Sequence, residues 1–223
     1  MQISVSNDKL INLVVTQLNN FFGEEEKGRV FLLKAIEKAI ERIEHCFSFT
    51  TNKYYRNRGK VFFHPFHAGQ YTIFLYFLSM VVFKEGRKIL ADKIYYLNKA
   101  LNSVDLYYEV ELPEIFGLDH PLGSVIGRAK FSDFFFFTQN CTVGNNKGVY
   151  PVFGENVSLL AGATVIGKSH IGNNCIISAN TYIKDQDVPD NSLVFGISPD
   201  LTIKHKEESF FWGDDAFFTK KPY

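Results

Sequence analysis

The chain has 223 residues, with 24 basic and 24 acidic side chains and no net formal charge at pH 7. This length suits one domain of moderate size or two small ones. The charge balance argues against nucleic acid or an anionic membrane as a partner. Met1 to Asp8 is too polar for a signal peptide, and the longest apolar run, Tyr71 to Phe83, is too short to cross a bilayer. We therefore expect a cytoplasmic protein without a membrane segment.

Four segments in the first part of the chain have the apolar spacing of helices. Ser6 or Asn7 can cap the first segment, and Gly23 ends it. The third segment is apolar on all sides, which is typical of a helix in the centre of a bundle. An α-helical region is therefore expected to about residue 103, with helices at 7–22, 28–47, 71–83 and 87–102.

The loop between the second and third helices, residues 48–66, is predicted to be irregular. Its basic residues are expected in solvent, with contact to an acidic ligand as the alternative: Lys53, Arg56, Arg58 and Lys60. His64 and His67 are close in sequence, but no cysteine or carboxylate cluster accompanies them, so no metal site is expected. A turn is the simplest role for His67, and a place in an acceptor site is the alternative.

The second half of the chain repeats with a period of six residues. Every sixth residue from Phe153 is large and apolar, which fits neither an amphipathic helix nor an alternating strand. Such a period fits short parallel strands wound around a prism, in stacked coils of about eighteen residues. The large residues fill the axis and compact residues lie near the corners: Phe153, Leu159, Val165, Ile171, Ile177 and Ile183; Val157, Ala163, Ser169, Cys175 and Thr181.

The repeat weakens on both sides of this segment. Before it, Phe131, Phe137 and Val143 keep the phase, and about four extra residues leave the prism in the loop Asn145 to Tyr150. After it, residues 193–203 form a last extended stretch. The charged and aromatic tail, 204–223, is expected to cap the open end of the prism or to dock on a neighbouring molecule.

The three cysteines are odd in number and form no CxxC pair, which argues against a disulfide framework. Cys141 and Cys175 occupy positions of the repeat where a compact side chain is needed. We therefore expect buried free thiols at these two positions and at Cys46.

This pattern resembles the hexapeptide-repeat acyltransferases, whose coils wind as a left-handed parallel β-helix. The resemblance implies an α+β protein: an α-helical domain (1–103), a left-handed β-helix of hexapeptide repeats (104–203) and a C-terminal tail (204–223). The axis of such a prism is filled, so a binding site must lie between prisms or against a loop. A homotrimer with clefts between its subunits is therefore expected, and helical domains could join two trimers.

Four motifs resemble those of the serine O-acetyltransferases, which carry VDIH, LDH, GxVxG and LQxVTLGG. The corresponding segments are 104–106 (VDL), 118–120 (LDH), 123–127 (GSVIG) and 138–144 (TQNCTVG). In that family the histidine of LDH is the general base and the aspartate of VDI orients it. The spacing matches, so the resemblance implies that His120 is the base and Asp105 its partner.

The chemistry agrees with these residue types. Acetyl transfer from a thioester to an alcohol needs a base that titrates near neutrality, and a carboxylate can hold its tautomer. The resemblance implies acetyl-CoA as cosubstrate, with Ala161 and Ala179 offering backbone amides to its pantetheine arm and Gly162 and Ser178 beside them. The corner at Gly144 and Asn145 is the candidate donor to the oxyanion.

The acceptor is where the chain departs from that family. The family binds its amino acid with an Arg-His-Pro tripeptide, and here the matching residues are Val149, Tyr150 and Pro151. Tyr150 could contact a sugar ring or be a packing residue. We therefore expect a saccharide of a surface polysaccharide as acceptor, with four candidate residues around it: Asp119, Gln139, Tyr150 and His67.

Two other functions stay open at this point. One is serine O-acetyltransferase activity, which the motifs themselves suggest. The other is a non-catalytic β-helix that organises partners through its helical region and aromatic tail. Release of coenzyme A with serine alone would favour the first, and failure of acetyl-CoA to raise the melting temperature would favour the second.

Overall fold

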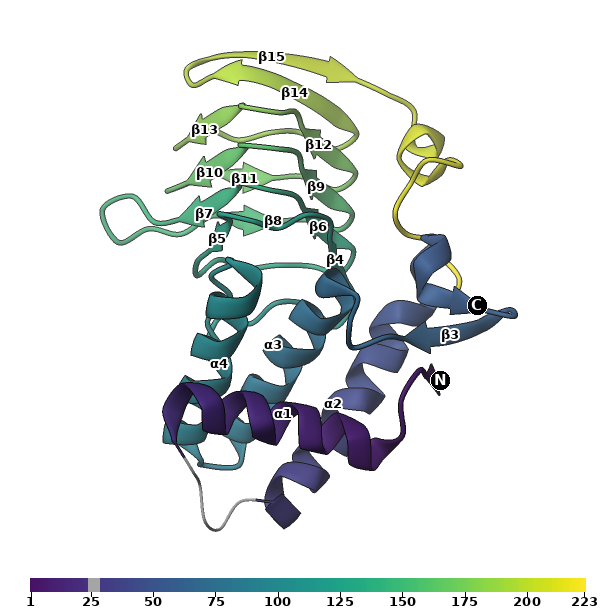
Figure 1. The fold of residues 1–223 in the computed structure, drawn as a ribbon. Coiled ribbons are helices and arrows are strands. Elements are labelled where there is room, and N and C mark those ends of the chain that lie inside the picture. The colour runs from purple at the N-terminus through teal and green to yellow at the C-terminus, as the bar shows by residue number, and fades with distance from the viewer. Residues whose placement is uncertain (24–28) are drawn as a thin grey trace.

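A computed structural model describes residues 1–23 and 29–223 and confirms the predicted fold class. An α-helical region lies beneath a left-handed parallel β-helix, which rises from it as a stack of coils (Figure 1). All four predicted helices are present; the first residue of the predicted 28–47 helix lies outside the described residues. Their bounds are Asn7–Phe22 (α1), Arg29–Ser48 (α2), Ala68–Lys84 (α3) and Lys88–Asn102 (α4).

Local chemistry explains where the helices begin and how they pack. The side chain of Ser6 caps α1 by accepting a hydrogen bond from the amide of Lys9. Helix α3 is buried from Gln70 to Val82 because it lies in the centre, against α2 and α4, which explains why it is apolar on all sides. None of the helices in the described residues is long and apolar enough to cross a membrane.

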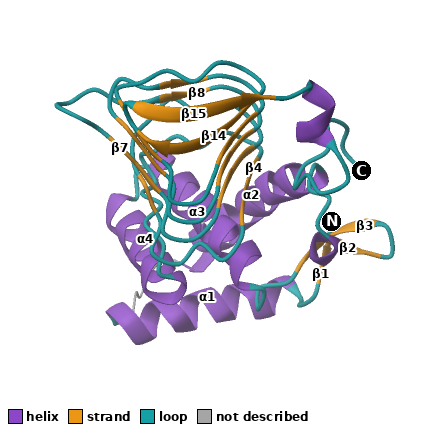
Figure 2. Ribbon diagram, turned by 90° about the horizontal axis from the view of Figure 1, so that it is seen from above, coloured by secondary structure: helices purple, strands orange, loops and turns teal. Residues whose placement is uncertain are grey.

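The β-helix has three faces. Face A joins β4, β6, β9, β12 and β14, face B joins β5, β7, β10 and β13, and the third face joins β8 and β11. Figure 2 shows the faces of β4, β7 and β8 as three sides of the stack. The strands are Phe116–Leu118 (β4), Val125–Ile126 (β5), Phe135–Phe137 (β6), Thr142–Gly144 (β7), Val152–Phe153 (β8), Val157–Leu159 (β9), Thr164–Ile166 (β10), His170–Ile171 (β11), Cys175–Ile177 (β12), Tyr182–Lys184 (β13) and Ser192–Ile197 (β14).

The predicted register is confirmed. Val165 pairs with Ile183 in the next coil and with Val143 in the previous one. The second pair is four residues further apart in sequence than the first, because the loop after β7 leaves the prism as expected (Figure 1). All six predicted axis residues are at most 1% exposed, and the compact residues are also buried.

The helices and the β-helix share one continuous hydrophobic core. The rings of Phe77 in α3 and Phe116 in β4 have centroids 5.5 Å apart. The hydroxyl of Tyr76 donates to the carbonyl of Val110 and accepts from the amide of Leu112, which satisfies it where α3 meets the first coil. The proposed division of the chain near residue 103 therefore crosses a packed junction, and the domain boundaries stay a prediction.

The loop 48–66 is more regular than predicted. It holds a short 3-10 helix and a hairpin, and the N-terminus adds a parallel strand to it. Arg56 is only partly exposed: its guanidinium donates to the carbonyls of Phe47, Ser48 and Thr50, so it caps the end of α2. These elements are Lys53–Tyr55 (η1), Arg56–Asn57 (β2), Lys60–Phe63 (β3) and Gln2–Ile3 (β1).

The end of the chain also differs from prediction. Residues 193–203 do not form one extended stretch: β14 turns back into an antiparallel strand, β15 (Asp200–His205), across the open end of the prism. The tail 204–223 therefore does not cap that end. It passes through the 3-10 helix Glu208–Trp212 (η2), descends beside the prism and pairs with the helical region, where Thr50 and Phe218 form an antiparallel bridge (Figure 1).

Candidate active site

The corners of the coils stack into three edges, which we number in chain order. The first edge follows face A, the second follows face B, and the third follows the face of β8 and β11. Backbone hydrogen bonds connect successive corners along the first edge, from Gly162 to Gln139 and from Asn180 to Ala161. The first edge comprises residues 119–124, 138–141, 160–163 and 178–181; the second comprises 145–151, 167–169 and 185–187; the third comprises 154–156, 172–174 and 189–191.

Most of the predicted site residues lie together on the first edge. The candidate base is at the bottom of this edge, and the residues expected to contact the coenzyme follow it upward, one corner in each coil. Sequence separations of about one coil therefore become a vertical line of neighbours. The residues in this line are Asp119, His120, Gln139, Ala161, Gly162, Ser178 and Ala179.

The backbone of this edge offers hydrogen-bond donors to a ligand. In the described part of the chain, the amides of Ala161 and Ala179 have no hydrogen-bond acceptor, whereas the amides on either side of each bond to the neighbouring coils. Gly162 lies at φ +74°, and a Cβ there would be 2.4 Å from the side-chain oxygen of Asn180, so glycine permits the close stacking of corners. The line of unpaired amides suits a flexible chain with carbonyl acceptors, such as pantetheine.

His120 is free to meet a substrate. Its side chain is 80% exposed, and its Nε2 is 3.7 Å from Oδ1 of Asp119. The carbonyl of His120 accepts from the amide of Leu122, which closes the turn that holds the ring outward. An exposed imidazole beside a carboxylate can take a proton from an alcohol and stabilise the imidazolium that forms.

His67 lies near the bottom of the first edge. It caps α3, because its Nδ1 accepts from the amide of Gln70, and this contact leaves the proton on Nε2. A Cβ on Gly69 would be 3.3 Å from Leu118 and 3.4 Å from His67, which places this imidazole beside the LDH segment. Burial lowers the pKa of His67, and Asp119 opposes that shift in part.

Asp105 has other partners in the single chain. It forms a parallel bridge with Val125 at the base of face B. Its carboxylate accepts from the hydroxyl of Tyr95 at 2.8 Å and from Nζ of Lys99 at 2.6 Å. Among the residues that the structure describes, no hydrogen bond or ion pair joins Asp105 to His120, so its predicted orienting role stays a prediction.

The second edge carries Asn145 and Tyr150, and Gly144 directly precedes it at the end of β7. The protruding loop closes on itself between Asn146 and Val149. In the described residues the amide of Asn145 has no acceptor, and Tyr150 is 40% exposed. The two edges are separated by face B, so one chain does not bring Asn145 to His120.

Several residues around the site were not predicted. Tyr95 and Lys99 on α4 bind the carboxylate of Asp105, and no sequence period connects this helix to the coil that it meets. Tyr54 and Tyr55 flank His67, with ring centroids at 5.9 and 5.7 Å, but no sequence period connects a loop to a helix start.

The cysteines do not take part in this site. All three are buried and free, as predicted. Burial raises the pKa of Cys46 to about 12 and that of Cys175 to about 11, so their thiols are protonated at neutral pH and are poor nucleophiles. The described residues contain no group of three or more histidine, cysteine or acidic residues able to hold a metal.

Comparison with known proteins agrees with this geometry. Residues 150–185 match the family described as bacterial transferase hexapeptide (six repeats). The chain is 24% identical over 147 residues to a serine acetyltransferase of Staphylococcus aureus, and the match covers 59% of this chain and 63% of the relative. The chain thus spans less than two thirds of the length of that curated relative.

Solved structures extend the likeness to the helical region. The serine acetyltransferase of Brucella abortus in complex with coenzyme A superposes with a TM-score of 0.66 at 18% identity, covering 91% of this chain and 83% of that chain. The Neisseria gonorrhoeae enzyme gives 0.65 at 19%, covering 91% and 81%. The chain therefore has the fold of a parallel β-helix, and residues 150–185 of that β-helix match the hexapeptide family. Its fold, helices included, is similar to that of the serine acetyltransferases.

Proposed function

We propose that the chain is an acetyl-CoA-dependent O-acetyltransferase. The observation that carries this proposal is the first edge, where an exposed imidazole stands at the foot of a line of unpaired amides. The pantetheine arm lies along the amides of Ala161 and Ala179, which brings the thioester toward His120. The matched hexapeptide family and the relatives named serine acetyltransferase support the same chemistry.

In this mechanism His120 takes the proton of the acceptor hydroxyl while its oxygen attacks the thioester carbonyl. The tetrahedral intermediate carries its charge on oxygen, where a backbone amide such as that of Asn145 stabilises it. Collapse breaks the carbon–sulfur bond, and the departing thiolate recovers the proton from His120. Asp105 orients the imidazole when its carboxylate is brought within reach.

The active unit that we propose is a homotrimer. His120 and Asn145 are on different edges of one prism, so a neighbouring copy must supply one of them to each site. The first edge of one prism then faces the second edge of the next, with acetyl-CoA between them. A monomer in solution that retained full activity would contradict this arrangement.

Serine is the acceptor that the comparisons favour, because the relatives carry its name. A saccharide hydroxyl is the second candidate. It is favoured by one observation: Val149 and Tyr150 occupy the positions where that family has an arginine and a histidine, so the cation that would bind an amino-acid carboxylate is missing from those two positions.

The test is release of coenzyme A thiol from acetyl-CoA, with L-serine and with neutral saccharides as separate acceptors. His120→Ala is expected to lower the rate by about 10²- to 10⁴-fold. His170→Ala is the matched control, since His170 is exposed on β11 of the third face, away from the first edge. Thiol release that survives His120→Ala would sink the proposed mechanism.

A further inference from the structure

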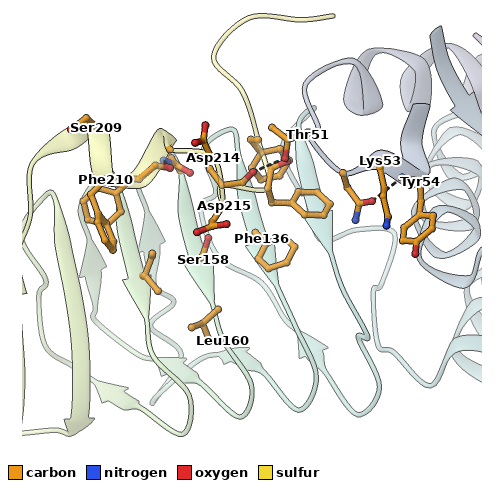
Figure 3. A pocket seen from close by; sticks show the side chains of 18 residues that line it. Thr51, Lys53, Tyr54, Phe136, Ser158, Leu160, Ser209, Phe210, Asp214 and Asp215 are labelled. Atoms are coloured by element: carbon orange, nitrogen blue, oxygen red, sulfur yellow. Dashed lines mark hydrogen bonds between the residues drawn. The ribbon is translucent and has the colours of Figure 1, made fainter. Parts of the chain in front are cut away.

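A groove separates the C-terminal tail from the outer surface of face A (Figure 3). Its volume is about 850 Å³, within the range of about 300–1,000 Å³ that is usual for small-molecule sites. The outward side chains of Phe136, Ser158 and Ile176 form its floor. Residues 51–54, 209–211 and 213–218 form its walls.

Specific contacts hold the walls of this groove in place. The amide of Thr51 donates to the carbonyl of Phe217 at 2.9 Å, and the side-chain amide of Asn156 donates to the carbonyl of Phe211 at 3.3 Å. A Cβ on Gly117 would come within 2.3 Å of the Phe217 ring, so the absence of a side chain in β4 makes room for the tail. The groove is therefore a built feature of the fold.

The lining combines aromatic surfaces with unpaired hydrogen-bond acceptors. Tyr54, Phe136 and Phe210 contribute rings. In the described part of the chain, neither the hydroxyl of Ser158 nor the carboxylate of Asp215 has a hydrogen-bond or ion-pair partner, and Figure 3 shows Asp215 directed toward Ser158. A ligand that packs an apolar face on a ring while its hydroxyls donate to a carboxylate has the chemistry of a saccharide.

The charges of the lining disfavour coenzyme A in this groove. Asp214 and Asp215 line it against one lysine, Lys53, so the lining is net acidic and repels phosphate and carboxylate groups. The phosphate-bearing end of coenzyme A is therefore an unsuitable occupant. Serine is far smaller than the groove and would leave most of its aromatic surface uncovered.

The position of the groove connects it to the first edge. Leu160 lines it and directly precedes Ala161, whose unpaired amide is part of the proposed coenzyme site. At the lower end, the ring centroid of Tyr54 is 5.9 Å from that of His67, which is beside the LDH segment. A ligand in the groove thus extends toward the proposed coenzyme site and toward the LDH segment that carries His120.

We infer that the groove binds a saccharide without acidic groups, with its ring on Phe136 and its hydroxyls donating to Asp215. Its role as the acetyl acceptor rests on the function proposed above. The saccharide site itself does not, since binding needs no acetyl-CoA. This assignment favours the second acceptor over serine.

The chain contains its own reporter for this site. Its single tryptophan, Trp212, lies between the lining residues Phe211 and Gly213, and its Nε1 donates to Asn174 at 3.0 Å. Neutral mono- and disaccharides, such as galactose, N-acetylglucosamine and lactose, are titrated into the full chain. Tryptophan fluorescence and saturation-transfer NMR of the sugar are recorded together, and glucuronic acid serves as the charged comparison.

A saturable response to a neutral sugar, stronger than to glucuronic acid, is expected. Asp215→Asn should weaken binding by about tenfold or more, because a hydrogen bond to a charged group is lost. Asp200→Asn, a matched exposed aspartate in β15, should leave the affinity unchanged. Absence of both signals for every sugar, or equal affinity in Asp215→Asn and the parent chain, would overturn the inference.

The two proposals fail separately. Thiol release with serine, together with no sugar binding, overturns the saccharide site and leaves acetyl transfer standing. Sugar binding that depends on Asp215, together with no thiol release from acetyl-CoA for any acceptor, supports the saccharide site and overturns the proposed enzyme activity.

Discussion

The C-terminal tail lies beside face A of the β-helix (Figure 1), but the tail and the coils are held in place by different kinds of contact. In the coils, each buried residue has an equivalent in the coils above and below, as Val165 has Val143 and Ile183. The tail has no repeat, and each of its contacts occurs once, such as the Thr50–Phe218 bridge. The coils therefore depend on a pattern, whereas the tail depends on individual pairs.

This difference matches a division in the proposed chemistry between binding of the coenzyme and selection of the acceptor. The coils supply the first edge, whose line of amides suits a coenzyme shared by many enzymes. The tail and the loop 48–66 supply the walls of the groove, where an acceptor would be selected. Non-repeating segments on a rigid scaffold commonly carry specificity.

The largest expected effect comes from breaking the pattern of the coils. Val165→Asp places a carboxylate without a partner on the filled axis, where Val165 is 0% exposed, and should cost more than about 4 kcal/mol and prevent folding. Thr164→Asp is the control, since that neighbour faces outward and is partly exposed. Circular dichroism melts report the result, and a cooperative, near-normal melt of Val165→Asp would contradict the filled axis.

The next effect tests whether the tail rests on a single pair. Gly117→Ala should cost about 1–3 kcal/mol by displacing the Phe217 ring. Phe217→Ala should cost roughly 2–3 kcal/mol, because that ring is only partly exposed. With the ring already gone, Gly117→Ala should cost much less, so the double variant should be less destabilised than the sum.

Urea denaturation measures this coupling. Gly213→Ala is the matched control, since its Cβ would meet only ordinary contacts at 3.7 Å and longer. Additive losses in the double variant would show that Phe217 and Gly117 do not depend on each other, and the tail would then be held by its other contacts.

A smaller effect compares corners of the first and second edges. Gly162→Ala forces a side chain into φ +74° against Asn180 and should cost about 1–3 kcal/mol. Gly144→Ala should change stability by less than about 0.5 kcal/mol, because it has no positive φ and its nearest neighbour is Ile166 at 3.9 Å. Equal effects in thermal melts would remove the distinction between the edges.

The smallest expected effect is the pH dependence of His67. Its pKa is lower in the folded chain than the usual value of about 6.5, so the unfolded chain binds more protons and stability falls as pH drops through 6.5 toward the folded pKa. His67→Asn keeps a capping side chain and removes this titration.

As the pH falls from 7.5 to 5, the melting temperature of the parent chain should therefore fall more than that of His67→Asn. His170→Asn, on the exposed third face, is the matched histidine-to-asparagine comparison. A constant difference across this pH range for His67→Asn would argue that the imidazole is not held in its neutral form.

Much of the fold could be predicted, because positions that are buried at a regular interval carry apolar residues at the same interval in the sequence. The helices, the six axis residues and the protruding loop after Gly144 were all found from spacing alone. The residues of the first edge were also named, although only the resemblance suggested their roles. Those roles are not tested by the structure and stay predictions.

The errors lie where the chain does not repeat. Arg56 was expected in solvent, yet three backbone carbonyls at the end of α2 bind it. The tail was expected at the open end or on a neighbour, yet it returns to the helical region. The partners of Asp105 in α4 were missed because a helix and a coil meet there through packing that has no sequence period.

The sequence by itself determined the prism and the line of the first edge. Equivalent positions in successive coils have the same burial, so they need the same kind of residue, and this repeat is visible in the sequence. The tertiary structure alone decided the path of the tail, the capping role of Arg56 and the groove over face A. These depend on contacts that each occur once between distant segments, such as Phe217 beside Gly117, and a single contact leaves no periodic signal in a sequence.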